Sequence, residues 1–248
     1  MIKIALEAVG FITNDISYNK NRIIKAIEEC EDKADLLVFG ETFLQGFQSL
    51  CWSFEKDRTV AVAESDPIIS EIRDAAKANK VAVSFGYIEK ADDKIYSSQL
   101  TIDKEGKTIS NFRRVSPGWK EEIADEHYCE GKEFPVFEFE GKVFSVGLCG
   151  DLWFDENCAA VETLKADVVL WPVYTDFNFT DWNSSIKDEY AEQAAKIGKT
   201  VLYVNSYCLD MDDDEIARGG AAVFSNGKIM EEVPAGEERV LLFEEKGE

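Results

Sequence analysis

The chain has 248 residues, 45% of them hydrophobic and 12% aromatic, which is enough for a substantial core and excludes a disordered chain. Its 49 acidic and 27 basic residues give a formal net charge of -22, which argues against general binding to nucleic acid or anionic membranes, because both attract cationic surfaces. The opening MIKIALEAVGF is too short for the apolar part of a signal peptide, and no segment is long enough to span a bilayer, so we expect a cytoplasmic protein.

Short β-branched or apolar runs alternate with helical stretches, a pattern typical of α/β architecture. In chain order the sequence predicts a strand at 2–9, a helix at 18–31, a strand at 36–40, a helix at 67–80, strands at 81–90, 97–103, 107–115, 134–141, 142–151 and 166–173, a helix at 188–197, and strands at 199–206 and on both sides of a turn within 219–233. Three of these strand pairs are expected to be hairpins, with turns at 104–106, 140–141 and 226–227.

No internal repeat, low-complexity linker or Pro/Gly-rich boundary interrupts the sequence, so we expect one domain over residues 1–248. The acidic clusters at 210–215 and 237–248 are interpreted as a solvated loop and a solvated tail. The six cysteines lack the close pairs of a zinc site and the density of a disulfide scaffold, so reduced thiols are expected at Cys30, Cys51, Cys129, Cys149, Cys158 and Cys208.

Two reactive side chains follow apolar runs, where α/β folds commonly place their sites. Glu41 comes directly after LLVFG, and partial burial at a strand end would suit this carboxylate to act as a base. Cys149 follows another apolar run and has Gly147 and Gly150 as small neighbours, which would let a tight turn expose its sulfur. Since His127 is the only histidine, a thiol base must be that residue or a carboxylate such as Glu41.

A third segment, NFRRVSPGWK at 111–120, carries cations at another strand end. Arg113, Arg114 or Lys120 could stabilise a thiolate or a developing oxyanion there. Alone, these cations could equally be surface charges that balance an acidic protein, but the three segments in this order are far more specific than any one of them.

Taken together, VFGETFLQGF, NFRRVSPGW and VGLCGDLWFDE resemble the nitrilase or carbon-nitrogen hydrolase superfamily over nearly the whole chain. The resemblance implies a four-layer α-β-β-α sandwich, with Glu41 as general base, Cys149 as nucleophile, and the backbone around Gly150 and Asp151 in the oxyanion region. The position of the superfamily's lysine falls on Arg114. Because arginine keeps its charge but cannot readily give up a proton, we expect Arg114 to act electrostatically and Lys120 to be the candidate acid.

Many members of the superfamily have a second glutamate that orients the substrate, and here Glu126 is preferred to Glu122. Aromatic side chains near the three segments are expected to line the pocket, with Trp119, Trp153 and Tyr174 as the main candidates beside Phe43 and Trp171.

The resemblance implies hydrolysis of a small amide or carbamoyl compound through an acyl-thioester, with no metal or organic cofactor. It also implies assembly into a homodimer or higher homo-oligomer. Two alternatives stay open: a catalytically silent relative that binds a ligand or partner in the same pocket, and an acyltransferase that uses an amine instead of water.

Overall fold

The strands of the protein form two six-stranded sheets. The structure is a computed structural model and describes residues 1–30, 32–210 and 216–245. In spatial order the first sheet contains β14 (Arg239–Glu245), β1 (Ile2–Ala8), β3 (Leu36–Phe39), β4 (Ala82–Ala91), β5 (Lys94–Ile102) and β6 (Thr108–Arg113). The second contains β13 (Lys228–Val233), β12 (Ala221–Ser225), β10 (Thr200–Asn205), β9 (Val168–Val173), β8 (Lys142–Val146) and β7 (Val136–Phe139).

Each sheet has a parallel centre and antiparallel edges. Strands β1, β3 and β4 run parallel in the first sheet, as do β8, β9 and β10 in the second, and the remaining neighbours pair antiparallel. A short parallel pair, β2 (Gly10–Phe11) with β11 (Tyr207–Cys208), joins the two halves of the chain. The central strands are buried on both faces and therefore read as continuous apolar runs in the sequence.

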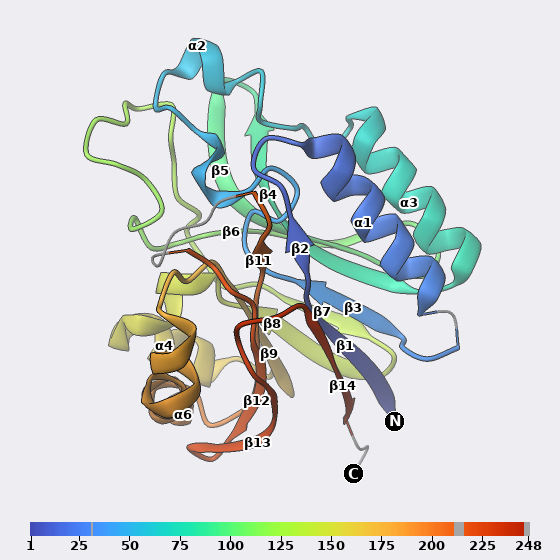
Figure 1. Cartoon of the computed structure of the whole chain (residues 1–248), viewed down its shortest axis with the longest axis vertical. Coiled ribbons are helices and arrows are strands. Elements are labelled where there is room, and N and C mark those ends of the chain that lie inside the picture. The colour runs from blue at the N-terminus through green and yellow to red at the C-terminus, as the bar shows by residue number, and fades with distance from the viewer. Residues whose placement is uncertain (31, 211–215, 246–248) are drawn as a thin grey trace.

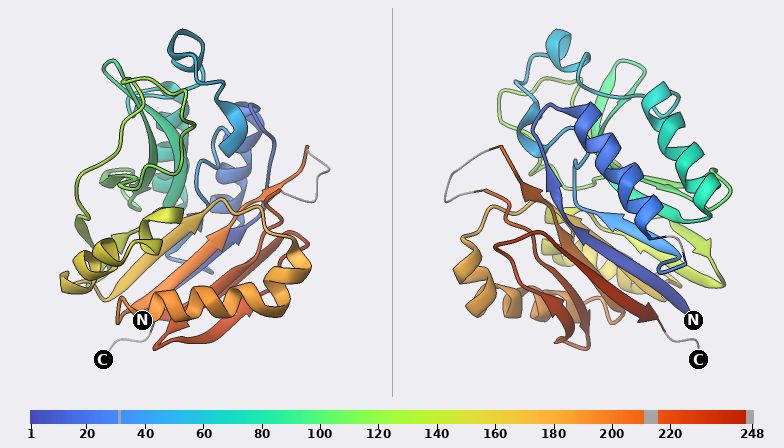
Figure 2. Two further views of the ribbon diagram at one scale, coloured as in Figure 1. Left: turned by 90° about the vertical axis from the view of Figure 1, so that its left-hand side faces the viewer. Right: turned by 45° about the vertical axis from the view of Figure 1, so that its right-hand side comes forward.

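Helices cover the outer face of each sheet. The helical segments are α1 (Ile16–Glu29), η1 (Phe47–Ser49), α2 (Phe54–Asp57), α3 (Pro67–Asn79), η2 (Cys149–Trp153), α4 (Asp155–Thr163), α5 (Phe179–Asp181), η3 (Trp182–Ile186) and α6 (Lys187–Ala195). Figure 1 shows α1 and α3 beside the first sheet, with α4 and α6 on the opposite side of the molecule. The two views in Figure 2 show the same order of layers.

Three apolar layers hold this arrangement together. The middle layer lies between the sheets and includes Ile4 and Leu6 from the first sheet and Leu170 and Leu202 from the second. The two outer layers fix α1 and α3 to the first sheet and α6 to the second. The expected α-β-β-α sandwich is therefore confirmed.

Local sequence signals explain the helix starts and the tight turns. The Asp15 side chain accepts a hydrogen bond from Tyr18 N and caps α1, and Asp66 caps α3 in the same way, just before Pro67. The predicted turns at 140–141 and 226–227 both have two successive residues with positive φ, as a two-residue hairpin requires.

The expected solvated tail at 237–248 needs correction, because residues 239–245 form β14. This strand pairs antiparallel with all of β1, from Ile2 opposite Glu245 to Ala8 opposite Arg239. The acidic residues of the segment concealed its strand-like core, in which Leu241 is buried against the inter-sheet layer. Residues 246–248 of that tail lie outside the described residues, as do 211–215 of the predicted acidic loop and residue 31 of the predicted first helix.

Candidate active site

Three strand ends bring the predicted catalytic side chains together. Glu41 follows β3, Arg114 follows β6, and Cys149 follows β8 after a two-residue link. In the antiparallel pair β5–β6, Ser98 lies opposite Arg113. The next position places Arg114 beside Ser97, whose carbonyl accepts the Arg114 N–H at 2.9 Å.

The carboxylate of Glu41 is buried, and its two oxygens differ in their hydrogen bonding. Its Oε1 accepts hydrogen bonds from Ser97 Oγ and from Arg114 Nη1, both at 2.9 Å. Its Oε2 is also buried, but has no hydrogen-bond partner among the described residues. One oxygen is therefore held by two donors, whereas the other accepts no hydrogen bond from the described residues.

The guanidinium of Arg114 is almost fully buried, at 3% exposure. Burial alone would lower its pKa, but the Glu41 carboxylate, Cys149 and Asp151 together raise that pKa above its ordinary value. Its Nε donates to Ser116 Oγ at 2.9 Å. The group is thus a permanent cation at this site and does not act as an acid.

Cys149 starts the short helical turn η2 with a φ of 42°, the left-handed conformation expected of a nucleophile on a sharp turn. Its thiol donates weakly to the Tyr174 carbonyl at 3.4 Å, and its own carbonyl accepts from Trp171 Nε1 at 2.8 Å. Burial, followed by the Glu41 carboxylate, raises the pKa of this thiol to about 12, although Arg114 acts in the opposite direction. These surroundings favour the protonated form of the thiol.

Asp151 connects the loop that carries the cation to the loop that carries the nucleophile. Its Oδ1 accepts from the backbone N–H groups of Val115 at 3.0 Å and Ser116 at 2.6 Å, while Oδ2 accepts from Leu148 N at 3.0 Å. Burial raises the pKa of Asp151 to about 6, opposed by Arg114 and by these hydrogen bonds.

Two glycines leave room for these close approaches. A Cβ atom at Gly86 would lie 2.3 Å from Thr42 N, directly behind Glu41. A Cβ atom at Gly150 would lie 2.5 Å from Arg114 Nη2, so the guanidinium reaches the backbone next to the nucleophile only because this residue is glycine.

The carbon-nitrogen hydrolase family model matches residues 3–244. The chain belongs to the carbon-nitrogen hydrolase family. Its resemblance to this family, first seen in the three motifs, is thereby confirmed.

Relatives of known activity span most or part of the chain. The chain is 26% identical over 238 residues to an (R)-stereoselective amidase from Pseudomonas sp, which covers 96% of this chain and 83% of that protein. It is 25% identical over 177 residues to an N-carbamoylputrescine amidase from Oryza sativa subsp. japonica, covering 68% of this chain but only 58% of that protein.

Solved structures share the fold. A mutant of the amidase from Nesterenkonia sp. AN1, which shows the result of Michael addition of acrylamide at its active-site cysteine, superimposes with a TM-score of 0.80 at 20% identity. The alignment covers 99% of this chain and 94% of that one. A glutamine-dependent NAD+ synthetase from Acinetobacter baumannii superimposes with a TM-score of 0.77 at 21% identity, over 97% of this chain and 45% of that one.

In this family member, Lys120 has partners of its own in the loop after β6. Its Nζ donates to the Tyr128 carbonyl at 2.9 Å and lies 2.7 Å from Glu130 Oε1. No hydrogen bond or ion pair within the described ranges joins Lys120 to Glu41 or to the nucleophile. Arg114 contacts Glu41 directly, whereas the contacts of Lys120 lie within its own loop.

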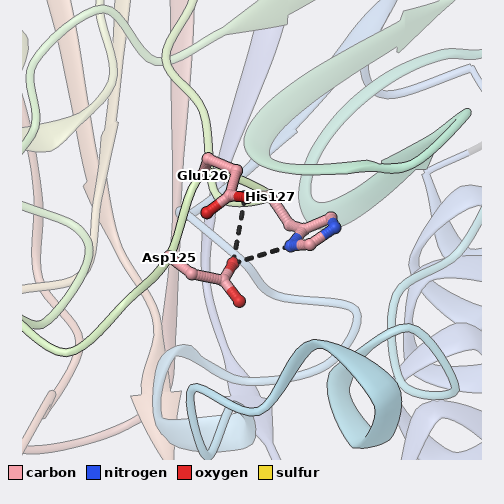
Figure 3. A group of neighbouring side chains, drawn as sticks. All are labelled: Asp125, Glu126 and His127. Atoms are coloured by element: carbon pink, nitrogen blue, oxygen red, sulfur yellow. Dashed lines mark hydrogen bonds and ion pairs between the residues drawn. The ribbon is translucent and has the colours of Figure 1, made fainter.

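The proposed second glutamate, Glu126, is exposed and belongs to a surface group with Asp125 and His127 (Figure 3). Asp125 Oδ1 accepts from the backbone N–H of His127 at 3.0 Å and lies 2.9 Å from its Nδ1. Each of the three residues offers a ligand atom within 4.8 Å of the others, although exposed acidic groups often gather in this way without a metal. The other candidate, Glu122, is exposed as well.

The aromatic candidates differ in how they relate to the nucleophile. Trp153 ends the turn that Cys149 begins and is 41% exposed. The Tyr174 ring stacks on Phe47 at 4.7 Å, so the main chain of Tyr174, and not its ring, faces the thiol.

Three other aromatic residues are buried. Trp119 packs against Trp52 and Tyr128 in a separate small core. Phe43 packs in the outer layer of the first sheet, and Trp171 reaches the site through its Nε1. Among the five aromatic candidates, Trp153 is the exposed one.

Sequence reasoning missed two residues that touch the site, Ser97 and Ser116. Ser97 lies within a predicted strand, where nothing marks it as different from Ser98. Ser116 follows the RRV run, and its role depends on Asp151, thirty-five positions along the chain. No local pattern in the sequence indicates either contact.

Proposed function

We propose that the protein hydrolyses the carbon-nitrogen bond of a small amide or carbamoyl compound through an acyl-thioester on Cys149, with Glu41 as the general base. The observation that carries this proposal is the arrangement of Glu41, in which Oε1 is held by Ser97 and Arg114 while the buried Oε2 has no partner. The Glu41 carboxylate is also close enough to raise the pKa of the Cys149 thiol.

The reaction starts when the thiol proton moves to Glu41 Oε2 as the sulfur attacks the substrate carbonyl carbon. The carbon-sulfur bond forms, and the carbonyl oxygen becomes an oxyanion that the Arg114 guanidinium and the Gly150 N–H stabilise. The first hydrogen bond of η2 runs from Asp151 N to the Leu148 carbonyl, so the N–H groups of Cys149 and Gly150 before it have no partner within that turn, which leaves the Gly150 N–H able to donate.

The tetrahedral intermediate then collapses and the carbon-nitrogen bond breaks. Because Arg114 cannot act as an acid, the proton held by Glu41 passes to the leaving nitrogen, which departs as ammonia or an amine. Water, deprotonated by Glu41, attacks the thioester, and the proton returns to the Cys149 sulfur as the acid leaves. No step requires a metal or an organic cofactor.

Support for an amide substrate comes from the relatives described above, an (R)-stereoselective amidase and an N-carbamoylputrescine amidase. The exposed ring of Trp153 beside the nucleophile supports a role in contacting that substrate. A silent binding protein would have no need for a base with an orphaned buried oxygen, since such a group costs free energy without serving catalysis.

The test measures ammonia or amine release from a panel of small amides, together with the intact mass of the protein after exposure to fluoroacetamide. We expect release by the natural protein, a single adduct at Cys149, and neither in Cys149→Ala. Cys51→Ala is the matched control, because Cys51 is an exposed thiol elsewhere. Release by Cys149→Ala, or no release and no adduct with the natural protein, would overturn the proposal.

We also propose that residues 1–248 act as one domain, in the cytoplasm, as a homo-oligomer. Free thiols at Cys30, Cys51, Cys129 and Cys158 support a reducing compartment. Within the described residues, no helix has the length and apolar character needed to cross a membrane. Light scattering at micromolar concentration tests the assembly, and a single monomeric peak would refute it.

A further inference from the structure

Two hydrogen bonds fix the plane of the Arg114 guanidinium. Nη1 donates to Glu41 on one side and Nε donates to Ser116 Oγ on the other, each at 2.9 Å. Since the guanidinium is rigid and planar, two bonds from different nitrogens also determine where the third nitrogen lies.

Ser116 is itself held in place from the nucleophile side. Its backbone N–H donates to Asp151 Oδ1, and the other oxygen of Asp151 accepts from the N–H of Leu148, the residue just before Cys149. Ser116 is 3% exposed and Asp151 is fully buried, so bulk solvent has little access to these hydrogen bonds. The contacts run from the nucleophile loop through Asp151 and Ser116 to the cation.

The third nitrogen, Arg114 Nη2, faces the backbone that follows the nucleophile. It would lie 2.5 Å from a Cβ atom placed on Gly150, and 3.4 Å from one placed on Gly118. The N–H of Gly150 belongs to the same backbone, so the guanidinium and this amide lie next to each other where the oxyanion would form.

We propose that Ser116 is a positioning residue: held by Asp151, it turns the Arg114 guanidinium so that Nη2 points at the oxyanion formed on Cys149. The inference rests on the proposed function. It also assigns Ser116 and Arg114 to one functional unit, because a lysine at position 114 has no atom equivalent to Nε that could donate to the serine hydroxyl.

The test compares Ser116→Ala, Ser116→Thr and Ser116→Val by steady-state kinetics on the best amide of the panel. Loss of the hydroxyl should lower kcat by about 10²-fold, with KM within about twofold, because a misplaced transition-state donor costs rate rather than substrate binding. Ser116→Thr should keep most of the activity, whereas Ser116→Val, of nearly the same shape, should not. Ser145→Ala, which removes a hydroxyl bonded to Pro135 O, is the control and should change neither constant.

A double-mutant cycle separates positioning from general structural damage. In an Arg114→Lys background, Ser116→Ala should have no further effect on kcat, because the contact it removes no longer exists. An equal loss in both backgrounds, or equal activity of the Thr and Val variants, would overturn the inference.

Failure of this inference is distinguishable from failure of the proposed function. An active natural protein with an unaffected Ser116→Ala variant would refute the role of Ser116 alone. A natural protein that releases no amine and forms no adduct would refute the proposed function itself.

Discussion

Removing Arg114 from the buried Glu41–Arg114 pair should cost far more stability than removing both partners. The two side chains are 0% and 4% exposed, and their closest atoms are 2.9 Å apart. With charge centres about 4 Å apart and an effective dielectric constant of about 20, the attraction amounts to about 4 kcal/mol. Arg114→Met leaves the Glu41 carboxylate buried with only the Ser97 hydroxyl as partner, so we expect it to lower the free energy of unfolding by about 3–5 kcal/mol.

The opposite single substitution should cost less. In Glu41→Gln the guanidinium keeps Ser116 and remains close to the Asp151 carboxylate, which also raises its pKa. The double variant buries no unpaired carboxylate and should recover much of the loss, giving a coupling energy of at least about 2 kcal/mol.

Urea unfolding of the four proteins at pH 7, followed by tryptophan fluorescence, measures this coupling. All three variants are expected to be catalytically impaired, so stability is the informative quantity. Additive losses, to within about 0.5 kcal/mol, would show that the pair is not held as described. An Arg114→Met variant no less stable than Glu41→Gln would refute the compensating role assigned to Asp151.

Glu7, Gly150 and Tyr128 each make a contact that a single substitution can test. Burial raises the pKa of Glu7 from 4.5 to about 7, so the folded state holds this proton more tightly, and its contribution to stability falls as pH rises through that range. Glu7→Gln should therefore be more stable than the natural protein by up to about 3 kcal/mol at pH 8 and equal to it at pH 4 in urea unfolding; an equal difference at both pH values would contradict this. In Gly150→Ala the new Cβ atom would lie 2.5 Å from Arg114 Nη2, so this variant should lower kcat by about 10²-fold. In Gly118→Ala the same distance is 3.4 Å, so kcat should fall much less. Similar losses of kcat in the two variants would refute the geometry. Tyr128→Phe removes the 2.6 Å hydrogen bond from the phenol to buried Asp57 and should cost about 1–3 kcal/mol of unfolding free energy, so an unchanged urea midpoint would argue against that bond.

The fold followed from the sequence wherever one segment contained its own signal. The apolar run before Glu41 and the Asn226–Gly227 turn are read from neighbouring residues, and both lie where expected. β14 was missed because its strand character depends on pairing with β1 at the other end of the chain. In isolation, its acidic residues are equally typical of a solvated tail.

The candidate site likewise contains residues that the sequence indicated and residues whose placement depends on distant contacts. The sequence predicted that Glu41, Arg114 and Cys149 belong together, because each lies at or close after the end of a strand and the three motifs in this order resemble those of the family. Lys120 and Glu126 lie in the irregular stretch between β6 and β7, where no periodicity shows which way a side chain points. Their placement beside Glu130 and Asp125 depends on how that stretch packs against the strands, which is a tertiary property.

Glu41 extends from the first sheet and Cys149 from the second, so no single element sets the distance between the two side chains. That distance depends on the hydrogen bond from Glu41 N to the Val173 carbonyl and on the apolar layer between the sheets, to which Val38, Val146 and Leu170 contribute. In the proposed mechanism, this layer helps to set the gap for proton transfer between the two side chains. A methyl group added or removed there, far from any substrate, would change the gap that the proton crosses, and a shift of about 1 Å is enough to change the rate by about 10²-fold. Selection on turnover would therefore act on the volume of these buried side chains as well as on the residues that touch the substrate.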